Sequence, residues 1–369
     1  MGLQFIPHNL NIDFIGLRKI SYTVSAIVIL VGLASLAMSG GPRYGIDFSG
    51  GATVQIKFEQ AISDETLKQS LDGAGLPGLV VQQFDDAGNT YLLRISSMDE
   101  TSTGIGDSVS KALDQSLAGA KYEIQRLEMV GPKVGADLRA QALEALYYAI
   151  LLMSIYISGR FEQRWFTAAF IACVLGGSMF GLGYLGMNKM YLVPLAVAVT
   201  LILCWKFKLV FALGAMVSIL HDVLITVGIF SLLDKEFDLT IIAALLTIVG
   251  YSLNDTIIVY DRIRENLRND TVTPLGEVIN RSINQTLSRT VLTSGTTLFV
   301  ILALLFFGGG MIFDFALVMF IGVVVGTLSS IFVASQVLLA FEKDIKREDF
   351  RPKTDNRPRG EDGRLAAQV

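Results

Sequence analysis

Long apolar runs alternate with short polar stretches along most of this chain. Residues 20–38 form an uncharged run about as long as a helix that crosses the hydrocarbon core of a bilayer. Beyond a polar interval, further apolar runs of similar length follow. They predict seven more spans, at residues 138–158, 165–187, 190–205, 209–232, 239–260, 291–307 and 315–341. The chain is therefore predicted to cross a membrane about eight times.

Two of these spans have alternative interpretations. A helix over residues 190–205 would rise only about 22 Å, against a hydrocarbon core of about 30 Å. This run also contains Pro194, so a re-entrant segment is the alternative. Residues 20–38 also resemble a cleaved signal peptide, because small residues lie near their end at positions 34–37. The length of the run and the upstream Asp13 favour a retained span.

The polar interval, residues 39–135, has the pattern of a small α+β domain. Apolar and polar residues alternate in several short segments, as in half-buried strands. The alternation slips near Arg126, and residues 85–89 have the composition of a turn. Strands are predicted at residues 53–58, 79–84, 90–95 and 121–129.

Two helices are predicted between these strands. Ser63 is placed to cap the first helix, which is expected to end near Gly73 and Gly75. The second helix has one apolar face with a spacing of four, formed by Ile105, Val109, Leu113 and Leu117. The resulting order, βαββαβ, is that of a ferredoxin-like domain.

The composition supports a membrane protein and argues against several kinds of site. Of the 369 residues, 52% are hydrophobic and 17% are charged, which is too apolar for a soluble domain of this size. Cys173 and Cys204 both lie in apolar runs, so neither a disulfide nor a metal site is expected. The two histidines cannot form a metal cluster, and there is no glycine-rich phosphate loop. No cofactor and no metal are predicted.

The charges of the loops predict the orientation of the spans. Basic residues gather in alternate loops, as expected for the cytoplasmic side. The opposite loops hold only Lys189 and Lys235, the latter among acidic residues. We therefore expect a cytoplasmic N-terminus (residues 1–19), an outer α+β domain, a membrane bundle (138–341) and a basic cytoplasmic tail (342–369) that is disordered beyond about residue 351. The cytoplasmic loops hold Arg160, Arg164, Lys206, Lys208, Arg262, Arg264, Arg268, Arg281 and Arg289.

Asp222 is the first candidate functional residue. It lies deep in the span at residues 209–232 beside His221, with Ser218 and Thr226 one turn away on the same helix face. A carboxylate in lipid costs several kcal/mol unless it is paired, hydrated or protonated. A carboxyl that changes its protonation state is a candidate proton carrier. The alternative is a permanently neutral Asp222 or His221 that bonds to a neighbouring helix.

A second polar group follows near the end of the span at residues 239–260. Asp255 and Asn254 lie within the apolar run, and Asp261 and Arg262 lie where the helix leaves the membrane. These residues predict either a hydrated path or polar contacts between helices. For Arg262 and Asp261 the alternative is an anchor at the water interface. Serine and threonine residues of the later spans, among them Ser294 and Ser329, are interpreted as helix-packing residues.

An ordered series of motifs resembles the SecF branch of the SecD/SecF protein-export family. The series covers nearly the whole chain outside one inserted region, and the whole set in order is far more specific than any one motif. The motifs are Gly45-Ile-Asp-Phe-Ser-Gly-Gly51, Arg160-Phe-Glu162, His221-Asp222, Gly250-Tyr-Ser-Leu-Asn-Asp-Thr256, Asp261-Arg-Ile-Arg-Glu-Asn266, Ser288-Arg-Thr290 and Thr293-Ser-Gly-Thr-Thr297.

The resemblance implies a helix bundle of the RND-exporter type with a ferredoxin-like domain outside the cytoplasm. It implies a non-enzymatic subunit of the bacterial cytoplasmic (inner) membrane that uses the proton-motive force in later steps of protein export. The implied partners are SecD, the SecYEG channel served by the SecA motor, YajC and YidC, the unfolded polypeptide in transit, and membrane lipid.

The resemblance also assigns roles to residues. Asp222 corresponds to the family's membrane-embedded aspartate in the proton path, and Arg262 is a partner in the charged network. The predicted proton pathway thus comprises Asp222, His221, Arg262, Asp255 and Asn254. The motif where the outer domain leaves the membrane comprises Gly45, Asp47, Gly50 and Gly51, and the two adjacent glycines can also be explained by a tight turn alone.

One region departs from the family pattern. Residues 163–206 stand between Arg160-Phe-Glu162 and the helix with His221-Asp222, where family members have almost no intervening chain. Two additional spans here would preserve the topology of everything that follows. The insertion is expected to be either a lipid-facing addition or a docking surface for another membrane subunit.

Two other functions fit parts of the sequence. The first is half of a proton-driven RND-type exporter of small molecules or lipids. It is disfavoured because the outer domain is too small for an enclosed drug pocket, and this chain would need a partner to complete an internal repeat. The second is an aspartyl protease that uses Asp222 and Asp255. Such catalysis needs two adjacent carboxyls, whereas these two are predicted at different depths.

Overall fold

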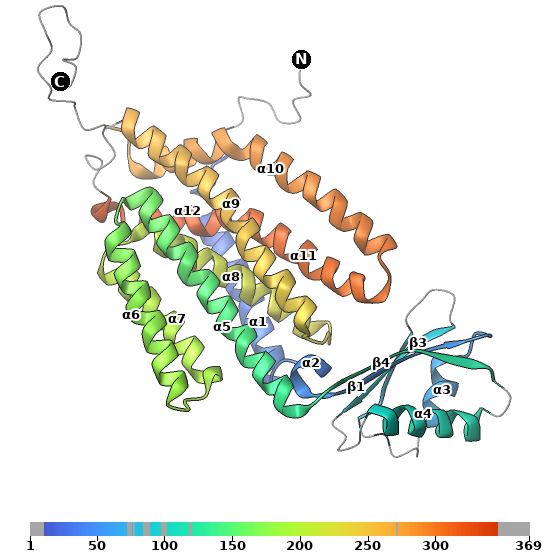
Figure 1. The fold of residues 1–369 in the computed structure, drawn as a ribbon. Coiled ribbons are helices and arrows are strands. Elements are labelled where there is room, and N and C mark those ends of the chain that lie inside the picture. Colours follow the sequence, from blue (N-terminus) through green and yellow to red (C-terminus); the bar gives the residue numbers. More distant parts are fainter. Residues whose placement is uncertain are drawn as a thin grey trace, which may run out of the picture.

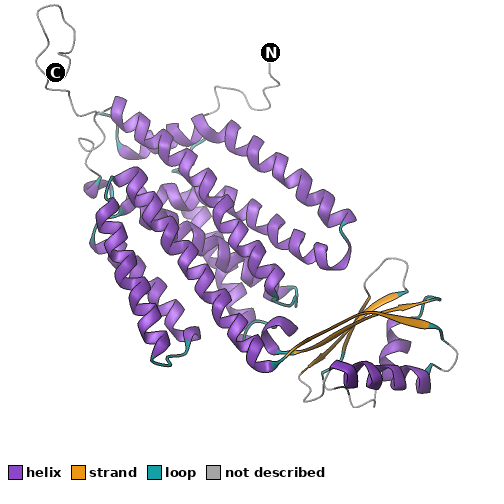
Figure 2. Cartoon of the chain, viewed as in Figure 1, coloured by secondary structure: helices purple, strands orange, loops and turns teal. Residues whose placement is uncertain are grey.

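A helix bundle stands beside a small α+β domain that extends from one end of it (Figures 1 and 2). The structure is a computed structural model and describes residues 11–71, 76, 78–83, 89–96, 102–117, 120–270 and 272–345. Predictions for Gly73 and Gly75, for residues 85–88 and for the tail beyond residue 345 lie outside these described residues.

The described part of the chain contains eight helices that are long and apolar enough to cross a membrane, which confirms the predicted number. Two of them continue through π-helical turns, η1 (Ser158–Glu162) and η2 (Ser330–Ala334), and η2 leads into α12 (Ser335–Ala340). The eight helices are α1 (Arg18–Met38), α5 (Pro132–Ile157), α6 (Trp165–Tyr184), α7 (Lys189–Lys206), α8 (Val210–Leu232), α9 (Leu239–Asn269), α10 (Leu275–Phe307) and α11 (Gly309–Ser329).

Helices α9 and α10 extend further than the apolar runs predicted. The polar segment after residue 269 is mostly the first part of α10, which begins at Leu275. Its side chains at Val278, Ile279 and Ile283 are buried, so this amphipathic extension is stabilised by packing that hydropathy alone does not report. The weakest predicted span, α7, is a continuous helix that contains Pro194.

Helix α8 lies at the centre of the bundle. It is the most thoroughly buried of the eight helices, with residues from nearly every face in the core. Its sequence is apolar all round, which is typical of a helix enclosed by others. The pair α6 and α7, which lies in the predicted insertion, packs beside α5 at the edge of the bundle, on the side away from α10 (Figure 1).

The α+β domain has the predicted order βαββαβ. It consists of β1 (Gly51–Phe58), α3 (Asp64–Leu71), β2 (Val80–Gln83), β3 (Thr90–Ser96), α4 (Ser102–Ser116) and β4 (Tyr122–Val130). The strands form an antiparallel sheet in the order β2-β3-β1-β4. Helices α3 and α4 cover one face of this sheet (Figure 2).

Local signals in the domain have structural counterparts. Ser63 accepts a hydrogen bond at Oγ from the Thr66 N–H, 3.2 Å away, and so caps α3 as predicted. The slip in alternation near Arg126 coincides with a bulge, because Gln55 pairs with Arg126 and the next residue, Ile56, pairs with Ile124. The extra residue lets both ends of β4 keep their apolar side chains toward the helices.

Candidate functional site

Asp222 lies at the junction of three helices in the middle of the bundle. Its side chain is only 1% exposed. One carboxylate oxygen, Oδ2, accepts hydrogen bonds from the Ser252 hydroxyl of α9 at 2.6 Å and from the Ser329 hydroxyl of α11 at 2.8 Å. A carboxyl in this position links α8 to α9 and to α11 through hydrogen bonds, so its protonation state affects both contacts.

His221 extends this network to α1. Its Nδ1 lies 2.9 Å from Asp222 Oδ1, and its Nε2 lies 2.9 Å from the Ser25 hydroxyl. Hydroxyl, neutral imidazole and carboxyl groups can each donate and accept a hydrogen bond, and the tautomer of His221 decides which nitrogen does which. Ser25, His221 and Asp222 therefore form a chain through which a proton can pass stepwise.

The pairing of α1 with α8 keeps one register along its length. Ser25 faces His221, Gly32 faces Gly228, and the Ser35 hydroxyl lies 2.9 Å from the Ser231 hydroxyl, so each pair is offset by 196 positions. The two helices are therefore parallel. A Cβ added at Gly32 would lie 2.6 Å from the Cα of Gly228, so the two backbones approach each other closely here.

Asp255 forms a second buried carboxyl site one helical turn after Ser252 on α9. It is 1% exposed, and its Oδ2 accepts a hydrogen bond from the Ser294 hydroxyl at 3.0 Å. Ser294 in turn accepts one from the Thr327 hydroxyl at 2.8 Å. Within the described residues, the other oxygen, Oδ1, has no hydrogen-bond partner. Asp255 thus retains an open position for a donor.

The structure separates the remaining predicted pathway residues from these two carboxyls. Asn254 is exposed, on a different face of α9 from Asp255. Arg262 pairs with Glu265 at 2.9 Å and lies seven residues, or about 10 Å, further along the helix from Asp255. Asp261 pairs instead with Arg160 at 3.1 Å.

Asp222 and Asp255 do not face each other as a catalytic pair. Each accepts hydrogen bonds from its own set of hydroxyls, and no hydrogen bond joins the two in the described structure. Two-carboxyl catalysis requires that the groups share a proton or a water in one pocket. The arrangement fits proton transfer between separate sites better than hydrolysis.

Several residues of the site carry no distinctive sequence signal. Ser25, Ser252 and Thr327 are isolated small polar residues, which are common in helix contacts. Sequence reasoning assigns Ser294 and Ser329 to packing, whereas both hydroxyls donate to buried carboxylates. A usable sequence signal is the spacing of Ser252, which lies three residues, or about one helical turn, before Asp255 and so shares a helix face with it.

Glu162 holds the beginning of α8 against the end of α5. Its Oε1 accepts a hydrogen bond from the Phe211 N–H at 2.8 Å, and its Oε2 accepts one from the Ser158 hydroxyl at 3.0 Å. Phe211 is in the first turn of α8, where backbone N–H groups lack partners within the helix. The glutamate acts as a helix cap supplied by a different helix.

The adjacent glycines at the base of the domain are required by the backbone. Gly50 and Gly51 have φ values of 76° and 137°, which favour glycine. A Cβ on Gly51 would lie 2.4 Å from the Ile95 carbonyl oxygen, and one on Gly50 would lie 2.8 Å from the Cα of Pro132. The backbone geometry therefore explains both glycines, which form a tight junction between the α+β domain and the bundle.

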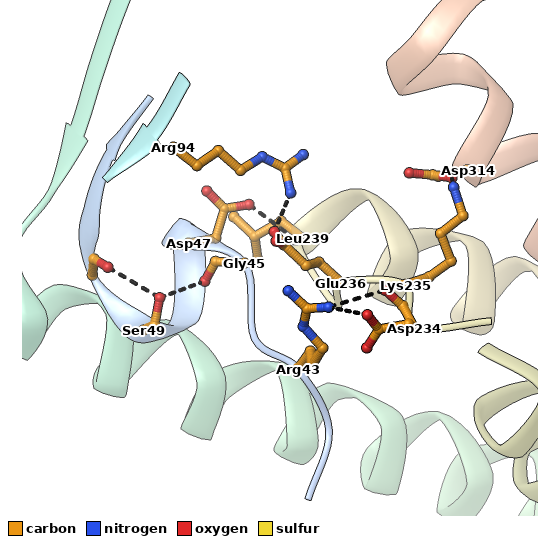
Figure 3. Close-up of polar contacts among 11 residues, drawn as sticks. Arg43, Gly45, Asp47, Ser49, Arg94, Asp234, Lys235, Glu236, Leu239 and Asp314 are labelled. Atoms are coloured by element: carbon orange, nitrogen blue, oxygen red, sulfur yellow. Dashed lines mark hydrogen bonds and ion pairs between the residues drawn. The ribbon is translucent and has the colours of Figure 1, made fainter. Parts of the chain in front are cut away.

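Gly45 and Asp47 connect the same junction to α9. The Gly45 N–H donates to the Phe237 carbonyl at 2.8 Å. Asp47 Oδ2 accepts a hydrogen bond from the Leu239 N–H, 3.0 Å away, at the first residue of α9 (Figure 3). The predicted motif residues therefore contribute to the attachment of the domain and lie at the end of the bundle, far along the chain from Asp222.

Two protein-family profiles match most of this chain. The family profile described as "Protein export membrane protein SecD/SecF, C-terminal" matches residues 109–190 and 177–344. A second profile, "SecD/SecF GG Motif", matches residues 39–62. Together the two profiles cover the beginning and the end of the α+β domain and the helices of the bundle from α5 onward.

Individual relatives extend this similarity. The protein translocase subunit SecF of Calditerrivibrio nitroreducens is 34% identical over 94% of this chain and 99% of its own length. That of Pseudomonas aeruginosa is 35% identical over 94% of this chain and 98% of its own length. The crystal structure of SecDF from Thermus thermophilus, a translocon-associated membrane protein, superimposes with a TM-score of 0.65 at 32% identity. The match covers 93% of this chain but only 40% of the SecDF chain.

Proposed function

The chain belongs to the SecD/SecF family of protein-export membrane proteins, and from this premise we propose that it is a SecF-type accessory subunit of the Sec protein translocase. A SecF relative matches 94% of this chain, and the match to the SecDF chain covers 40% of that chain. A SecD subunit would supply the remaining part. The SecYEG channel, the SecA motor and an unfolded polypeptide in transit are the further partners of this function.

The proposed energy source is the proton-motive force, with Asp222 as the proton carrier. The observation that carries this proposal is a carboxyl, 1% exposed, that accepts hydrogen bonds from two other helices and contacts His221. One proton that crosses 100 mV releases about 2.3 kcal/mol. Hydrogen bonds between membrane helices contribute about 0.6 kcal/mol each on average, so one proton supplies enough energy to rearrange the contacts of Asp222.

Protonation would reverse the direction of hydrogen bonds around Asp222. An ionised carboxylate only accepts, whereas a protonated carboxyl must donate one hydrogen bond. A proton on Oδ1 would be donated to His221 Nδ1, and the imidazole Nε2 would then carry the hydrogen that points to Ser25. The change reaches α1, which leads directly into the α+β domain.

The proposed orientation puts both termini in the cytoplasm and the α+β domain outside the bacterial cytoplasmic membrane. The basic loops at the end of the bundle opposite the domain support it. In this orientation Asp222 lies nearer the outer side than Asp255, which is one turn beyond Ser252 toward the cytoplasm. Asp255, with an open acceptor position, is the proposed second station, and the pathway roles of Asn254 and Arg262 stay predictions.

Reconstituted translocation tests this function. We would compare the wild type with Asp222→Asn in vesicles that contain SecYEG, SecA and SecD, with and without a proton gradient. Asp261→Asn is the matched control, because Asp261 is half-exposed and pairs with Arg160 at the membrane boundary. We expect Asp222→Asn to abolish the gradient-dependent component and to leave ATP-driven translocation intact. Gradient dependence equal to that of the wild type would refute the role of Asp222.

A further inference from the structure

The short loop between α8 and α9, residues 233–238, is attached to the chain segment that enters the α+β domain. The Phe237 N–H donates to the Arg43 carbonyl at 2.7 Å, and the Gly45 N–H donates to the Phe237 carbonyl at 2.8 Å. Arg43 also forms an ion pair with Asp234 (Figure 3). These backbone hydrogen bonds form a short parallel bridge between Tyr44 and Phe237, which holds the loop against the entry segment.

The same loop has a second attachment, directly to the sheet of the domain. Glu236 forms an ion pair with Arg94 of β3 (Figure 3). Their side chains are 19% and 22% exposed, so the pair is largely shielded from water. Among the ion pairs of the described residues, this is the one that joins the sheet to the helix bundle.

The loop is equally well attached on the bundle side. Lys235 pairs with Asp314 of α11 at 2.7 Å, and its ammonium lies 5.3 Å from the centre of the Phe313 ring. The loop also continues without a break into α8 and α9, the helices joined by the hydrogen bond between Asp222 and Ser252. It therefore contacts three helices of the Asp222 network at one end and the domain at the other.

Simple geometry indicates how much movement the loop would transmit. Asp222 lies 11 residues before Leu233, which corresponds to about 16 Å along a helix. A tilt of about 5° at Asp222 would therefore displace the loop by about 1.4 Å over that length. A hydrogen bond weakens over such a distance, so a tilt of this size would loosen the contact of Glu236 with Arg94.

Arg94 has other carboxylates nearby when the contact to Glu236 breaks. A cleft of about 250 Å³ separates the open face of the sheet from the loop, and it is lined by Arg94, Glu236, Asp238 and Glu128 among others. The lining of this cleft holds more carboxylates than cations, so a guanidinium released from Glu236 would keep acidic neighbours.

From these contacts we infer that Glu236 and Arg94 are positioning residues that couple shifts of α8 against α9 to the orientation of the α+β domain. This inference rests on the proposed function, because it assigns the transmission step between the proton site and the domain. When the contact between Glu236 and Arg94 is closed, it holds the sheet over the loop. When the contact is open, the domain turns about the Gly50–Gly51 junction and the entry segment.

A distance measurement on the complete protein tests this inference directly. Spin labels at Lys68→Cys on α3 and Met187→Cys beyond α6 would report the distance between domain and bundle, with Cys173→Ser to remove the exposed native thiol. We expect Glu236→Gln and Arg94→Gln each to broaden the distance distribution. The double variant Glu236→Arg with Arg94→Glu should restore a narrow one. Glu59→Gln, in an exposed ion pair with Lys121 inside the domain, is the matched control and should change nothing.

Translocation assays complete the test. A partly exposed ion pair contributes up to about 1 kcal/mol, which corresponds to about a fivefold change in an equilibrium. We expect each single variant to lower the gradient-dependent component by up to about fivefold and the charge-swapped pair to recover it. Distance distributions identical to the wild type in both single variants would overturn the inference, whatever their translocation activity. If Asp222→Asn left gradient dependence intact while these variants changed the distances, the proton-carrier proposal would fail and the positioning contact would stand.

Discussion

Replacing Gly228 by alanine should separate α1 from α8. A Cβ at this position would lie 2.8 Å from the Cα of Gly32. Carbon atoms in ordinary contact are about 3.5–4.0 Å apart, so the helices must move apart by about 0.7–1.2 Å. The hydrogen bonds from Ser25 to His221 and from Ser35 to Ser231 are each 2.9 Å long, and this movement would stretch both beyond 3.5 Å.

The sign of the effect follows from two opposing contributions. Two lost interhelical hydrogen bonds account for about 1.2 kcal/mol, and the loosened packing of the seam adds to this loss. Alanine favours the helix over glycine by about 1 kcal/mol. Overpacking at such a contact costs about 1–3 kcal/mol, so we expect a net destabilisation of about 1–3 kcal/mol at Gly228. Gly250→Ala, where an added Cβ has no neighbour within 4 Å, should be neutral or stabilising and is the control.

Thermal unfolding in lipid nanodiscs and cysteine cross-linking measure this prediction. Ser35→Cys with Ser231→Cys would form a disulfide across the seam, with Cys173→Ser as the background. We expect Gly228→Ala to unfold a few degrees below the wild type and to cross-link more slowly, and Gly250→Ala to do neither. Equal melting temperatures and cross-linking rates for both variants would refute the close contact of α1 with α8.

Three further predictions concern the cap of α8, the glycine junction and the first residue before α9. Glu162→Ala should lower the free energy of unfolding by about 1 kcal/mol, because the Phe211 N–H loses its hydrogen-bond acceptor. Glu162→Gln, which keeps an acceptor oxygen, should retain most of the wild-type stability. Equal stability of the two variants in urea titration would contradict this prediction. Gly51→Ala should lower the stability of the α+β domain by at least about 1–3 kcal/mol, because residue 51 has a φ of 137° and an added Cβ would collide with the Ile95 carbonyl. Unchanged rates of hydrogen exchange in β1 and β3 would disprove this prediction. Burial raises the pKa of the Asp238 carboxyl above its ordinary value, so its ionisation opposes folding as the pH rises through the raised pKa. Asp238→Asn keeps an acceptor for the Ile241 N–H in the first turn of α9. This variant should therefore have a higher melting temperature than the wild type at neutral pH but not below about pH 4. A difference in melting temperature that does not depend on pH would contradict the raised pKa of Asp238.

Much of the architecture follows from short-range patterns in the sequence. A hydrophobic run of bilayer length and an alternation with period two each reflect a local geometry, so the eight spans and the βαββαβ order were both predictable. The need for glycine at Gly50 and Gly51 is likewise local, because it arises from backbone conformation and immediate neighbours. The polarity of Asp222 and Asp255 within apolar runs marked both as exceptional without any knowledge of their partners.

Only the tertiary structure decided which groups these carboxyls meet. Ser329 lies 107 positions from Asp222, and Ser25 lies 196 positions from His221. Such contacts depend on the rotation, depth and neighbours of each helix, which are set by packing across the bundle rather than by periodicity along one segment. For the same reason Asn254 is exposed, although its neighbour in sequence, Asp255, is buried. The contact of Glu236 with Arg94 likewise depends on a domain folding back over a loop 142 positions later.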